Sequence, residues 1–493
     1  MPISRVVPKL LAVSCAVLGL APAPPARAQQ EANAAVDAVF ADVAKPGSPG
    51  CALGVYREGK MIYARGYGLA DLEQSVPITP QSVFDIGSTS KQFTVTSVLL
   101  LEKQGKLSVN DDVRKYIPEL PEYGGKITIL HLMNHTSGLR DYLTLFELAG
   151  INTDSVTTDE DALAIIARQK ALNFAPGSDW LYSNTGFFLL SVIVKRVSGQ
   201  PLAEFAAENI FTPLGMTHTQ FRDDHTSLIA KRALAYDPTG KGGYKLDVSY
   251  FEQTGDGAVH TSVEDLLRWD ENFYSAQIGG KAYLAEIQER GKLASGKALE
   301  YAKGLFVGDY RALHTVSHGG SWGGYRAELL RFPEQHFSVA CLCNVGNANP
   351  EKRARQVAEV YLGGLMKAKE EKREAEDLEK QKPEIALAAE QLRAYTGDYW
   401  SEELGVTYRL ALAGEKMKLA AVLDRTGLPR TGHALPIAWR ATAADEFAAS
   451  GAPLILHFRR GANGAVSGFT LDAGRTRDMI FLRRESAAER EAK

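Results

Sequence analysis

FDIGSTSK, residues 84–91, together with the apolar run FTVTSVLLL at residues 93–101, forms the stretch around which the chain is arranged. A run that is apolar on nearly every face predicts a helix buried on most of its sides, and Gly105 predicts its left-handed end. Asp85 is a candidate N-cap, which places Ser88 in the first turn near the positive end of the helix dipole. The stretch therefore predicts a buried helix with a serine at its start.

Ser88 and Lys91 are three residues apart, so their side chains share one face of this predicted helix. Burial favours the neutral form of a lysine, and a neutral amine beside a hydroxyl can accept the hydroxyl proton. The alternative is a capping serine and a lysine that extends to water, because Ser-x-x-Lys by itself is a common pattern. The pair is a candidate nucleophile and base whose assignment depends on the rest of the chain.

The 493 residues have the composition of a globular protein: 45% are hydrophobic, 23% are charged and the net charge is -3, with no indication of nucleic-acid binding. Residues 1–28 predict a signal peptide, with Arg5 and Lys9 before an apolar run and a cleavage site at Ala26-Arg27-Ala28. The apolar run is short for a membrane anchor. We therefore expect a periplasmic or secreted protein without a stable membrane span after signal cleavage.

Three cysteines follow the predicted signal peptide: Cys51, Cys341 and Cys343. Because their number is odd, they cannot all be paired, and the sequence predicts no disulfide framework. Strand alternation places the sulfurs of Cys341 and Cys343 on one face. We interpret them as small buried residues, with one optional bridge from Cys51 to either of the others. None has the electropositive or helix-start setting of a cysteine nucleophile.

Predicted strands at both ends of a long segment, with helices between them, indicate an α/β (α+β) fold: an antiparallel sheet flanked by helices, with a large helical insertion. The predicted strands are residues 51–56, 61–66, 304–310, 313–317, 325–331 and 337–343. The predicted helices include residues 31–45, 161–170, 186–197 and 263–274.

The composition changes after residue 350, where an almost wholly charged segment predicts an exposed helical spacer. Short alternating strands with turn residues between them then predict an all-β barrel. These strands are residues 408–412, 416–422, 454–459, 467–471 and 479–483. The predicted units are a signal peptide (1–28), a main domain (29–366), a charged helical linker (367–386) and a C-terminal barrel domain (387–487).

Two further motifs carry chemical groups. Tyr182-Ser183-Asn184 places a phenol that can relay a proton near a carboxamide that can donate to a carbonyl or hold a lysine. His318-Gly319-Gly320-Ser321 follows a predicted strand, and adjacent glycines there allow close approach to the backbone. A backbone N–H of this segment and that of Ser88 would make a two-donor oxyanion hole. The alternatives are an ordinary loop for the first motif and a glycine-rich turn with a surface histidine for the second.

In this order and spacing, the three motifs resemble those of the serine β-lactamase and penicillin-binding protein superfamily. The resemblance is greatest to its class C-like branch, which includes D-aminopeptidases, D,D-carboxypeptidases and family VIII-type esterases, and it covers roughly residues 33–366. Supporting segments are residues 132–139, 213–216, 257–259 and 265–266. The resemblance implies a β-lactamase/transpeptidase-like fold and acyl-transfer chemistry. The C-terminal segment resembles, more loosely, lipocalin-like β-barrels.

The resemblance also implies a role for each motif residue. Ser88 would be the nucleophile, Lys91 its partner in activation, and Tyr182 an assisting general base and acid. Asn184 would position the substrate and Lys91, and the N–H groups of Ser88 and Ser321 would form the oxyanion hole. The implied substrate-binding residues are Asn184, His318, Gly319, Gly320 and Ser321. No metal or other cofactor is implied, the expected partner is a small-molecule or peptide substrate, and the oligomeric state is open.

One position departs from the family pattern. β-Lactamases and carboxypeptidases usually have a lysine where this chain has His318, which is only partly protonated near neutral pH. This departure disfavours β-lactams and terminal carboxylates as substrates, unless Arg326 supplies the cation instead. We predict an exported serine hydrolase acting on an ester or a D-amino-acid-containing amide or peptide. The alternative within the family is a class C-like β-lactamase or D,D-carboxypeptidase.

Three other interpretations compete with this one. Residues 319–323, GGSWG, match the Gly-x-Ser-x-Gly elbow of α/β-hydrolases, but the sequence after Ser321 predicts a strand where that fold needs a helix. His131 with His135, or His314 with His318, are candidate metal ligands that lack an acidic third ligand nearby. A catalytically silent protein that binds cell-wall peptides is the non-enzyme alternative, and the intact motifs argue against it.

Overall fold

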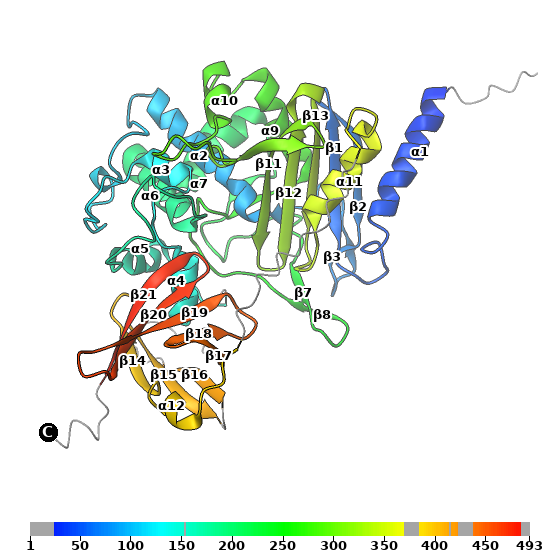
Figure 1. Cartoon of the computed structure of the whole chain (residues 1–493). Helices are drawn as coiled ribbons and strands as arrows, with labels where there is room; N and C mark the ends of the chain where they lie inside the picture. The colour runs from blue at the N-terminus through cyan, green and yellow to red at the C-terminus, as the bar shows by residue number, and fades with distance from the viewer. Residues whose placement is uncertain (1–23, 152–153, 369–383, 414–415, 423–436, 485–493) are drawn as a thin grey trace, which may run out of the picture.

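The computed structural model describes residues 24–151, 154–368, 384–413, 416–422 and 437–484. Its main sheet is antiparallel, with six strands in the order β10-β11-β12-β13-β1-β2 (Figure 1). The strands are β1 (Cys51–Arg57), β2 (Lys60–Tyr67), β10 (Phe306–Tyr310), β11 (Leu313–Trp322), β12 (Tyr325–Phe332) and β13 (Phe337–Cys343). The sheet pairs β1 with β13, so it joins the two ends of the main domain as predicted.

Alternate residues of the central strands face two separate cores. On β13, Val339 and Cys341 pack with apolar residues of α1 (Pro24–Val39) and α11 (Pro350–Leu362). Ala340 and Leu342 face the opposite way and join the larger core. That core includes α9 (Val263–Ser275), which lies against β1 and β13. The main sheet is therefore the middle layer between helices on both faces (Figure 1).

The segment between β2 and β10 contains the helices α2 to α10, which confirms the predicted helical insertion. Its α-helices besides α9 are α2 (Lys91–Lys103), α3 (Ile129–Met133), α4 (Tyr142–Leu148), α5 (Asp159–Ala167), α6 (Asn184–Ser198), α7 (Leu202–Ala206), α8 (Thr212–Leu214) and α10 (Lys281–Ile287). Short turns of other helical types are η1 (Gly87–Ser90), η2 (Val113–Lys115), η3 (Ala207–Phe211) and, after β12, η4 (Pro333–Gln335). Small strands are β3 (Leu69–Asp71), β4 (Val76–Pro77), β5 (Phe84–Asp85), β6 (Gln220–Phe221), β7 (Tyr236–Pro238), β8 (Tyr244–Leu246) and β9 (Val259–Thr261).

The predicted start of the central helix was wrong by several residues. The α-helix α2 begins at Lys91, and Ser88 belongs to the preceding 3₁₀ turn η1. Asp85 lies in β5, where its Oδ1 accepts the N–H of Gly87, the first residue of η1, at 2.7 Å, so it contacts the turn and is not the N-cap of the α-helix. Nearly all of α2 is buried, as its apolar sequence predicted, and it ends before Gly105, whose φ is +70°.

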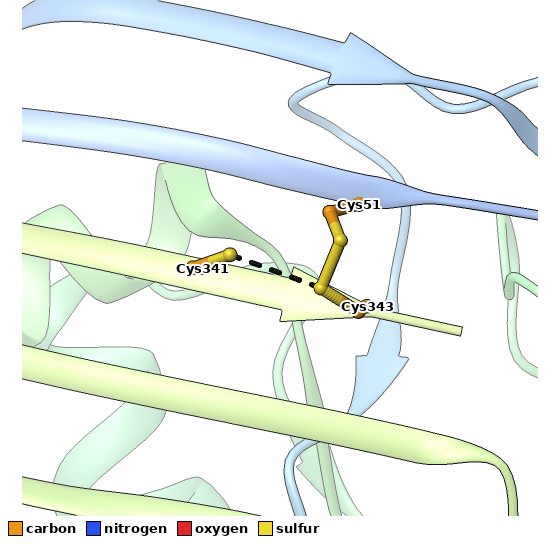
Figure 2. Close-up of side chains that lie close together, drawn as sticks. All are labelled: Cys51, Cys341 and Cys343. Carbon is orange, nitrogen blue, oxygen red and sulfur yellow. Dashed lines mark hydrogen bonds between the residues drawn. A yellow bond between two sulfur atoms is a disulfide. The ribbon is translucent and has the colours of Figure 1, made fainter. Parts of the chain in front are cut away.

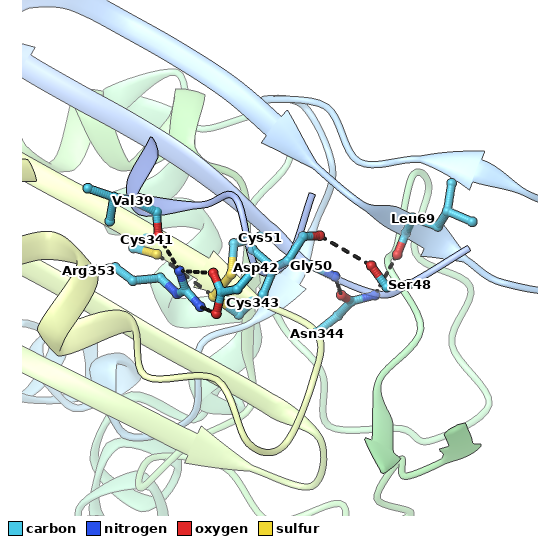
Figure 3. The surroundings of a disulfide bond; sticks show 11 residues. Val39, Asp42, Ser48, Gly50, Cys51, Leu69, Cys341, Cys343, Asn344 and Arg353 are labelled. Carbon is cyan, nitrogen blue, oxygen red and sulfur yellow. Dashed lines mark hydrogen bonds and ion pairs between the residues drawn. A yellow bond between two sulfur atoms is a disulfide. The ribbon is translucent and has the colours of Figure 1, made fainter. Parts of the chain in front are cut away.

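A disulfide joins β1 to β13 at directly opposed residues, Cys51 and Cys343 (Figure 2). Cys341 is a buried free thiol whose Sγ lies 3.8 Å from that of Cys343, so both sulfurs share one strand face as predicted. Beside the bridge, the guanidinium of Arg353 in α11 donates to both carboxylate oxygens of Asp42, at 2.9 and 2.7 Å (Figure 3). The bridge and this ion pair tie the first segment of the chain to the last elements of the main domain.

The C-terminal strands form a closed antiparallel barrel in which β14 pairs with β21, which confirms the predicted all-β barrel. Its strands are β14 (Gly397–Ser401), β15 (Val406–Ala413), β16 (Lys416–Val422), β17 (Ile437–Ala443), β18 (Glu446–Ala449), β19 (Leu454–Arg460), β20 (Val466–Ala473) and β21 (Thr476–Arg483), preceded by α12 (Ala389–Arg393). The prediction missed β14, β17 and β18. The predicted linker at 367–386 lies mostly outside the described residues.

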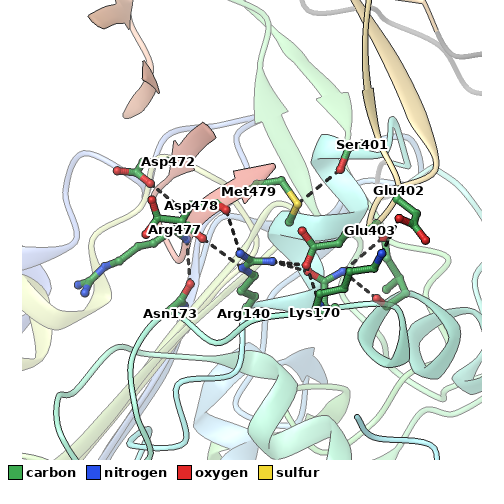
Figure 4. A network of polar contacts seen from close by, with 12 residues as sticks. Arg140, Lys170, Asn173, Ser401, Glu402, Glu403, Asp472, Arg477, Asp478 and Met479 are labelled. Atoms are coloured by element: carbon green, nitrogen blue, oxygen red, sulfur yellow. Dashed lines mark hydrogen bonds and ion pairs between the residues drawn. The ribbon is translucent and has the colours of Figure 1, made fainter. Parts of the chain in front are cut away.

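The barrel packs against the α4–α5 side of the main domain (Figure 1). At the centre of this contact, Arg140 donates to Glu403 Oε1 at 2.7 Å, and their side chains are only 1% and 4% exposed (Figure 4). Arg140 also donates to the backbone carbonyls of Arg477 and Asp478 in β21, both at 3.1 Å. Tyr408 of the barrel donates to a carbonyl of α4. Buried polar contacts therefore hold the barrel in one position.

The predicted signal peptide, residues 1–28, lies largely before the described residues. The part that is described belongs to α1, which starts earlier and ends earlier than the helix predicted at 31–45. Within the described ranges, no helix combines the length and the apolar character needed to cross a membrane.

Candidate active site

The turn η1, which carries Ser88, is hydrogen-bonded to two strands, β11 and β9. Thr89 Oγ1 donates to the carbonyl oxygen of His318 in β11 at 3.0 Å. On the other side, Ser90 Oγ accepts the N–H of Val259 in β9 at 3.1 Å. The turn therefore has little freedom relative to the main sheet, and the hydroxyl of Ser88 has a defined position.

Two glycines allow the turn to approach β11 closely. Gly87 has a φ of +48°, and a Cβ at this position would lie 2.8 Å from the amide nitrogen of Ser321. A Cβ at Gly320 would lie 1.9 Å from the carbonyl oxygen of Ile86. Any side chain at either position would therefore separate the turn from the strand. This close packing places the backbone of the Ser88 turn beside Ser321.

Lys91 is fully buried and has three partners. Its Nζ lies 2.9 Å from Ser88 Oγ, 3.0 Å from Asn184 Oδ1 and 2.6 Å from the backbone oxygen of Asp256. The amide oxygen of Asn184 and the carbonyl of Asp256 can only accept hydrogen bonds. A neutral amine would donate its two hydrogens to them and turn its lone pair toward the hydroxyl of Ser88. Burial lowers the pKa of Lys91 to about 7, so this neutral form is accessible near physiological pH.

The carboxyl group of Asp256 acts against this effect of burial. Its negative charge raises the pKa of Lys91, while burial raises the pKa of Asp256 itself. The hydroxyl of Tyr142 donates to Asp256 Oδ2 at 3.1 Å. No sequence motif marked Asp256, although it directly precedes the segment 257–259 that supports the family resemblance.

Tyr182 lies against the same amine. The Nζ of Lys91 is 5.0 Å from the centre of its ring. Its hydroxyl is buried without a partner of standard hydrogen-bond geometry, although Ser88 is near enough to lower its pKa. Burial has the larger effect and raises the pKa of Tyr182. The ring packs against that of His135 at a tilt of 32°, with 4.1 Å between the ring centres, and His135 Nδ1 accepts the N–H of Ser183 at 3.1 Å, so the whole motif is held in place.

Asp141 positions the backbone N–H of Asn184, although no sequence motif marked this aspartate. Its Oδ2 accepts the N–H of Asn184 at 2.6 Å, where α6 begins. Its Oδ1 accepts the N–H of Thr144 at 3.2 Å, in the first turn of α4. One carboxylate therefore occupies the positive ends of two helices. The sequence signal for it was an aspartate directly before an apolar helix, which is a common pattern.

The expectations for His318 were wrong in two respects. The strand β11 continues to Trp322, so His318 and the two glycines lie inside a strand and not after it. The imidazole is buried: its Nδ1–H donates to the carbonyl of Gly319 at 2.6 Å, and its Nε2 accepts from the hydroxyl of Tyr301 at 3.1 Å. Burial lowers the pKa of His318 to about 3. The side chain is therefore neutral at physiological pH and cannot replace a lysine.

Arg326 does not supply the cation either. Its Nη1 donates to the carbonyl oxygens of Gly323 and Tyr325, at 2.6 and 2.7 Å, and the residue does not line the cleft. A turn and then β12 follow Ser321, so this serine lacks the helix that a nucleophile elbow requires.

The candidate metal ligands have other contacts. His131 Nδ1 accepts the N–H of Thr128, and His135 Nδ1 accepts that of Ser183. His318 is held by Tyr301, while His314 lies beside Asp309 on the surface. The two histidine pairs therefore do not converge on a shared metal position.

The predicted site residues meet in one cleft with a volume of about 1240 Å³. Of the predicted residues, those that line it are Ser88, Tyr182, Asn184, His318, Gly319, Gly320 and Ser321. Lys91 lies behind Ser88 and is buried. The barrel also contributes Arg475 to the lining. No local motif marked Arg475, because it reaches the cleft only through the packing of the barrel on the main domain.

Comparison with known proteins gives a consistent picture. The Beta-lactamase family model matches residues 35–362. Penicillin-binding protein 4* of Bacillus subtilis (strain 168) is 30% identical over 306 residues, which cover 58% of this chain and 66% of that protein. A D-aminopeptidase of Brucella anthropi is 27% identical over 297 residues, which cover 60% of this chain and 56% of that enzyme. The chain thus spans less than two thirds of the length of either relative.

Among solved structures, the octameric penicillin-binding protein homologue from Pyrococcus abyssi is similar, with a TM-score of 0.60 and 22% sequence identity. The similarity covers 94% of this chain and 100% of that one. At this level of identity it concerns the fold alone. This structural similarity covers more of the chain than residues 35–362, which the family model matches.

Proposed function

The chain belongs to the Beta-lactamase family, and from this premise we propose that it is an exported serine hydrolase that forms an acyl-enzyme on Ser88. Its substrate is an ester or a D-amino-acid-containing amide or peptide. The proposed location is the periplasm or the extracellular space, because residues 1–28 have the pattern of a signal peptide.

The observation that carries the proposal is the set of contacts around Lys91. Two carbonyl oxygens and one hydroxyl surround its amine, and burial lowers its pKa to about 7. A neutral amine so placed can take the proton of Ser88 while its own hydrogens stay bonded. A lysine that merely paired with a surface acid would have a raised pKa and would not be buried.

The reaction then proceeds in two halves. Ser88 Oγ attacks the substrate carbonyl carbon as its proton passes to Lys91, and the N–H groups of Ser88 and Ser321 stabilise the oxygen that becomes negative. Tyr182 donates its proton to the leaving group and takes up the proton held by Lys91, so both groups are neutral again. Water then attacks the acyl-enzyme as it gives a proton to the same pair, and the pair returns that proton to Ser88 Oγ when the acid product leaves. Lys91 and Tyr182 titrate together, so the base is best described as the pair.

The cleft supports a substrate larger than a simple ester. Its volume of about 1240 Å³ exceeds the range of roughly 300–1,000 Å³ common for small-molecule sites. The neutral His318 removes the cation that β-lactamases usually have at this position, which favours ester or amide hydrolysis over β-lactam hydrolysis. The D-aminopeptidase relative supports an amide or peptide as substrate.

Intact mass spectrometry tests this proposal. The protein is exposed separately to esters, D-amino-acid amides, D-peptides, β-lactams and a fluorophosphonate. We expect a covalent adduct with at least one acyl donor, and its loss in Ser88→Ala but not in Ser321→Ala. Adducts that persist in Ser88→Ala would contradict the mechanism. A protein that binds D-peptides without turnover or adduct would be the silent binding protein, and rapid nitrocefin turnover would identify the β-lactamase alternative.

A further inference from the structure

Arg475 brings a positive charge from the barrel into the catalytic cleft. It lies in the turn between β20 and β21, directly before the first residue of β21. Its guanidinium carbon is 4.6 Å from the centre of the Tyr182 ring, and the side chain is 45% exposed. The residue lines the same cleft as Ser88. A residue more than 380 positions after the proposed nucleophile therefore reaches its surroundings.

The backbone of this turn is fixed on the main domain. Asn173 Nδ2 donates to the carbonyl oxygen of Arg475 at 2.9 Å, and Asn173 Oδ1 accepts the N–H of Arg477 at 2.8 Å. Behind this contact, the buried Arg140 donates to the carbonyl of Arg477. The network in Figure 4, which includes Arg140, Asn173 and Arg477, thus holds this hairpin on the main domain. The backbone of Arg475 is therefore held, while its side chain, which lies over the Tyr182 ring and forms a long ion pair with Asp141, remains partly exposed.

The guanidinium group has few partners of its own. Its charged neighbour is Asp141, whose Oδ2 is 3.9 Å from Arg475 Nη1. That carboxylate already accepts the N–H groups of Asn184 and Thr144. No hydrogen bond joins the guanidinium to any described residue. Its donors are therefore available to a group inside the cleft.

Of the other cations of the cleft, Lys91, Arg222 and Arg355 are already engaged, and Arg232 lines the cleft without contacting a motif residue of the described chain. Lys91 is committed to Ser88 and to the two carbonyl oxygens. Arg222 donates to the backbone carbonyls of Ser249 and His225, and Arg355 is paired with Glu351. Among the described arginines that line the cleft, Arg475 is the one that contacts a motif residue.

We propose that Arg475 binds a carboxylate of the substrate, so that the barrel sets a preference for anionic esters and for peptides with a free carboxyl group. A guanidinium presents paired donors that match the two oxygens of a carboxylate. This inference rests on the proposed hydrolase function. It assigns to Arg475 the substrate-binding charge that neither His318 nor Arg326 provides.

Matched pairs of chromogenic esters test the proposal with the full-length protein. The acyl-side pair is mono(4-nitrophenyl) glutarate and 4-nitrophenyl valerate. The leaving-group pair is 3-carboxy-4-nitrophenyl butyrate and 4-nitrophenyl butyrate. We expect Arg475→Gln to lower kcat/KM for the anionic member of one pair by about 10-fold or more, because hydrogen bonds to charged groups are strong. Most of this loss should appear as a higher KM and not as a lower kcat. The neutral member should change less than about 3-fold, and Arg475→Lys should recover part of the loss.

Arg477→Gln is the matched control, because Arg477 lies two residues after Arg475, in β21, but directs its charge to Asp179 outside the cleft. It should leave both pairs unchanged. Equal losses for anionic and neutral esters in Arg475→Gln would overturn the proposal, as would unchanged kinetics for both. Thermal unfolding of each variant reveals a merely structural effect, which would lower all rates together.

Equilibrium binding separates this proposal from the proposed function. Glutaric monoanilide and valeric anilide are stable amides, so calorimetry measures their binding without turnover. A preference for the anionic amide that disappears in Arg475→Gln supports the carboxylate site, even if Ser88→Ala still hydrolyses esters and the proposed function fails. No preference in the wild-type protein for either anionic amide or anionic ester would reject the site.

Discussion

The Nζ of Lys91 lies 2.6 Å from the backbone oxygen of Asp256, whose carboxyl group is buried in the same region. Burial destabilises the charged form of each residue, whereas the two charges stabilise one another. The protonation state of the amine beside Ser88 therefore depends on the carboxyl group of Asp256. A family motif that consists only of the serine and the lysine therefore leaves out the residue that influences the pKa of the lysine.

The first prediction concerns the pH dependence of catalysis. The base must be neutral, so kcat/KM should rise with pH as Lys91 loses its proton, with a midpoint near its pKa of about 7. Asp256→Asn removes the negative charge that raises this pKa, so the acidic limb of the profile should move to lower pH. The measurement is kcat/KM for a neutral 4-nitrophenyl ester across the acidic limb, corrected for spontaneous hydrolysis.

Asp398→Asn is a suitable control for this experiment. Asp398 lies in the barrel, where it pairs with Arg409, and its replacement should leave the profile in place. An acidic limb that stays fixed, or moves to higher pH, in Asp256→Asn would show that Lys91 is not the group that titrates.

Tyr182→Phe separates catalysis from stability. The phenol oxygen is buried without a standard hydrogen-bond partner, so its removal should change the free energy of unfolding by no more than about 1 kcal/mol. The loss of a proton-transfer group should lower kcat by about 10²–10⁴-fold. Steady-state kinetics and chemical denaturation of the same preparation measure both effects. A large loss of stability would mean that the hydroxyl supports the fold, and a normal kcat would remove Tyr182 from the mechanism.

The local parts of the site were predictable from the sequence. Ser88 and Lys91 are close in the chain, and the turn-to-helix geometry brings their side chains together even though the helix starts at Lys91. Asn184 likewise follows Tyr182 by two residues, and both line the cleft. The main sheet and the barrel followed from strand alternation and turn residues, which are also local signals.

The parts that escaped prediction depend on tertiary packing. The charge state of His318 is set by burial and by the nearby charge of Lys91, both of which lower the pKa of the imidazole, and Lys91 lies 227 residues earlier in the chain. The contribution of Arg475 requires that the barrel dock at Arg140, which no pattern around either residue indicates. Sequence motifs predicted which groups share the cleft, whereas the electrostatic environment of those groups depends on distant residues.

The docking of the barrel should depend on the buried ion pair between Arg140 and Glu403. Arg140→Met leaves the Glu403 carboxylate buried without its cation, which should cost about 3–5 kcal/mol. The double variant Arg140→Met/Glu403→Gln removes the uncompensated charge and should recover part of this loss. Chemical denaturation measures stability, and KM for the anionic esters shows whether Arg475 has lost its support.

Lys170→Ala provides the comparison for that experiment. Lys170 pairs with Glu402 at the same interface, but their side chains are 60% and 72% exposed. An exposed pair of this kind should contribute less than about 1 kcal/mol. If Lys170→Ala were as destabilising as Arg140→Met, burial of the ion pair would not explain the docking.

The disulfide gives the last prediction. Cys51 and Cys343 are separated by 292 residues and close nearly the whole main domain into one loop. Cys51→Ala/Cys343→Ala should lower stability by about 2–5 kcal/mol, because the open chain regains conformational freedom on unfolding. Cys341→Ala should retain the bridge and lose much less. Peptide mapping without reduction should recover Cys51 linked to Cys343, with Cys341 alkylated only after denaturation since it is buried. A peptide that links Cys51 to Cys341 would instead show that the neighbouring thiol forms the bridge in the folded protein.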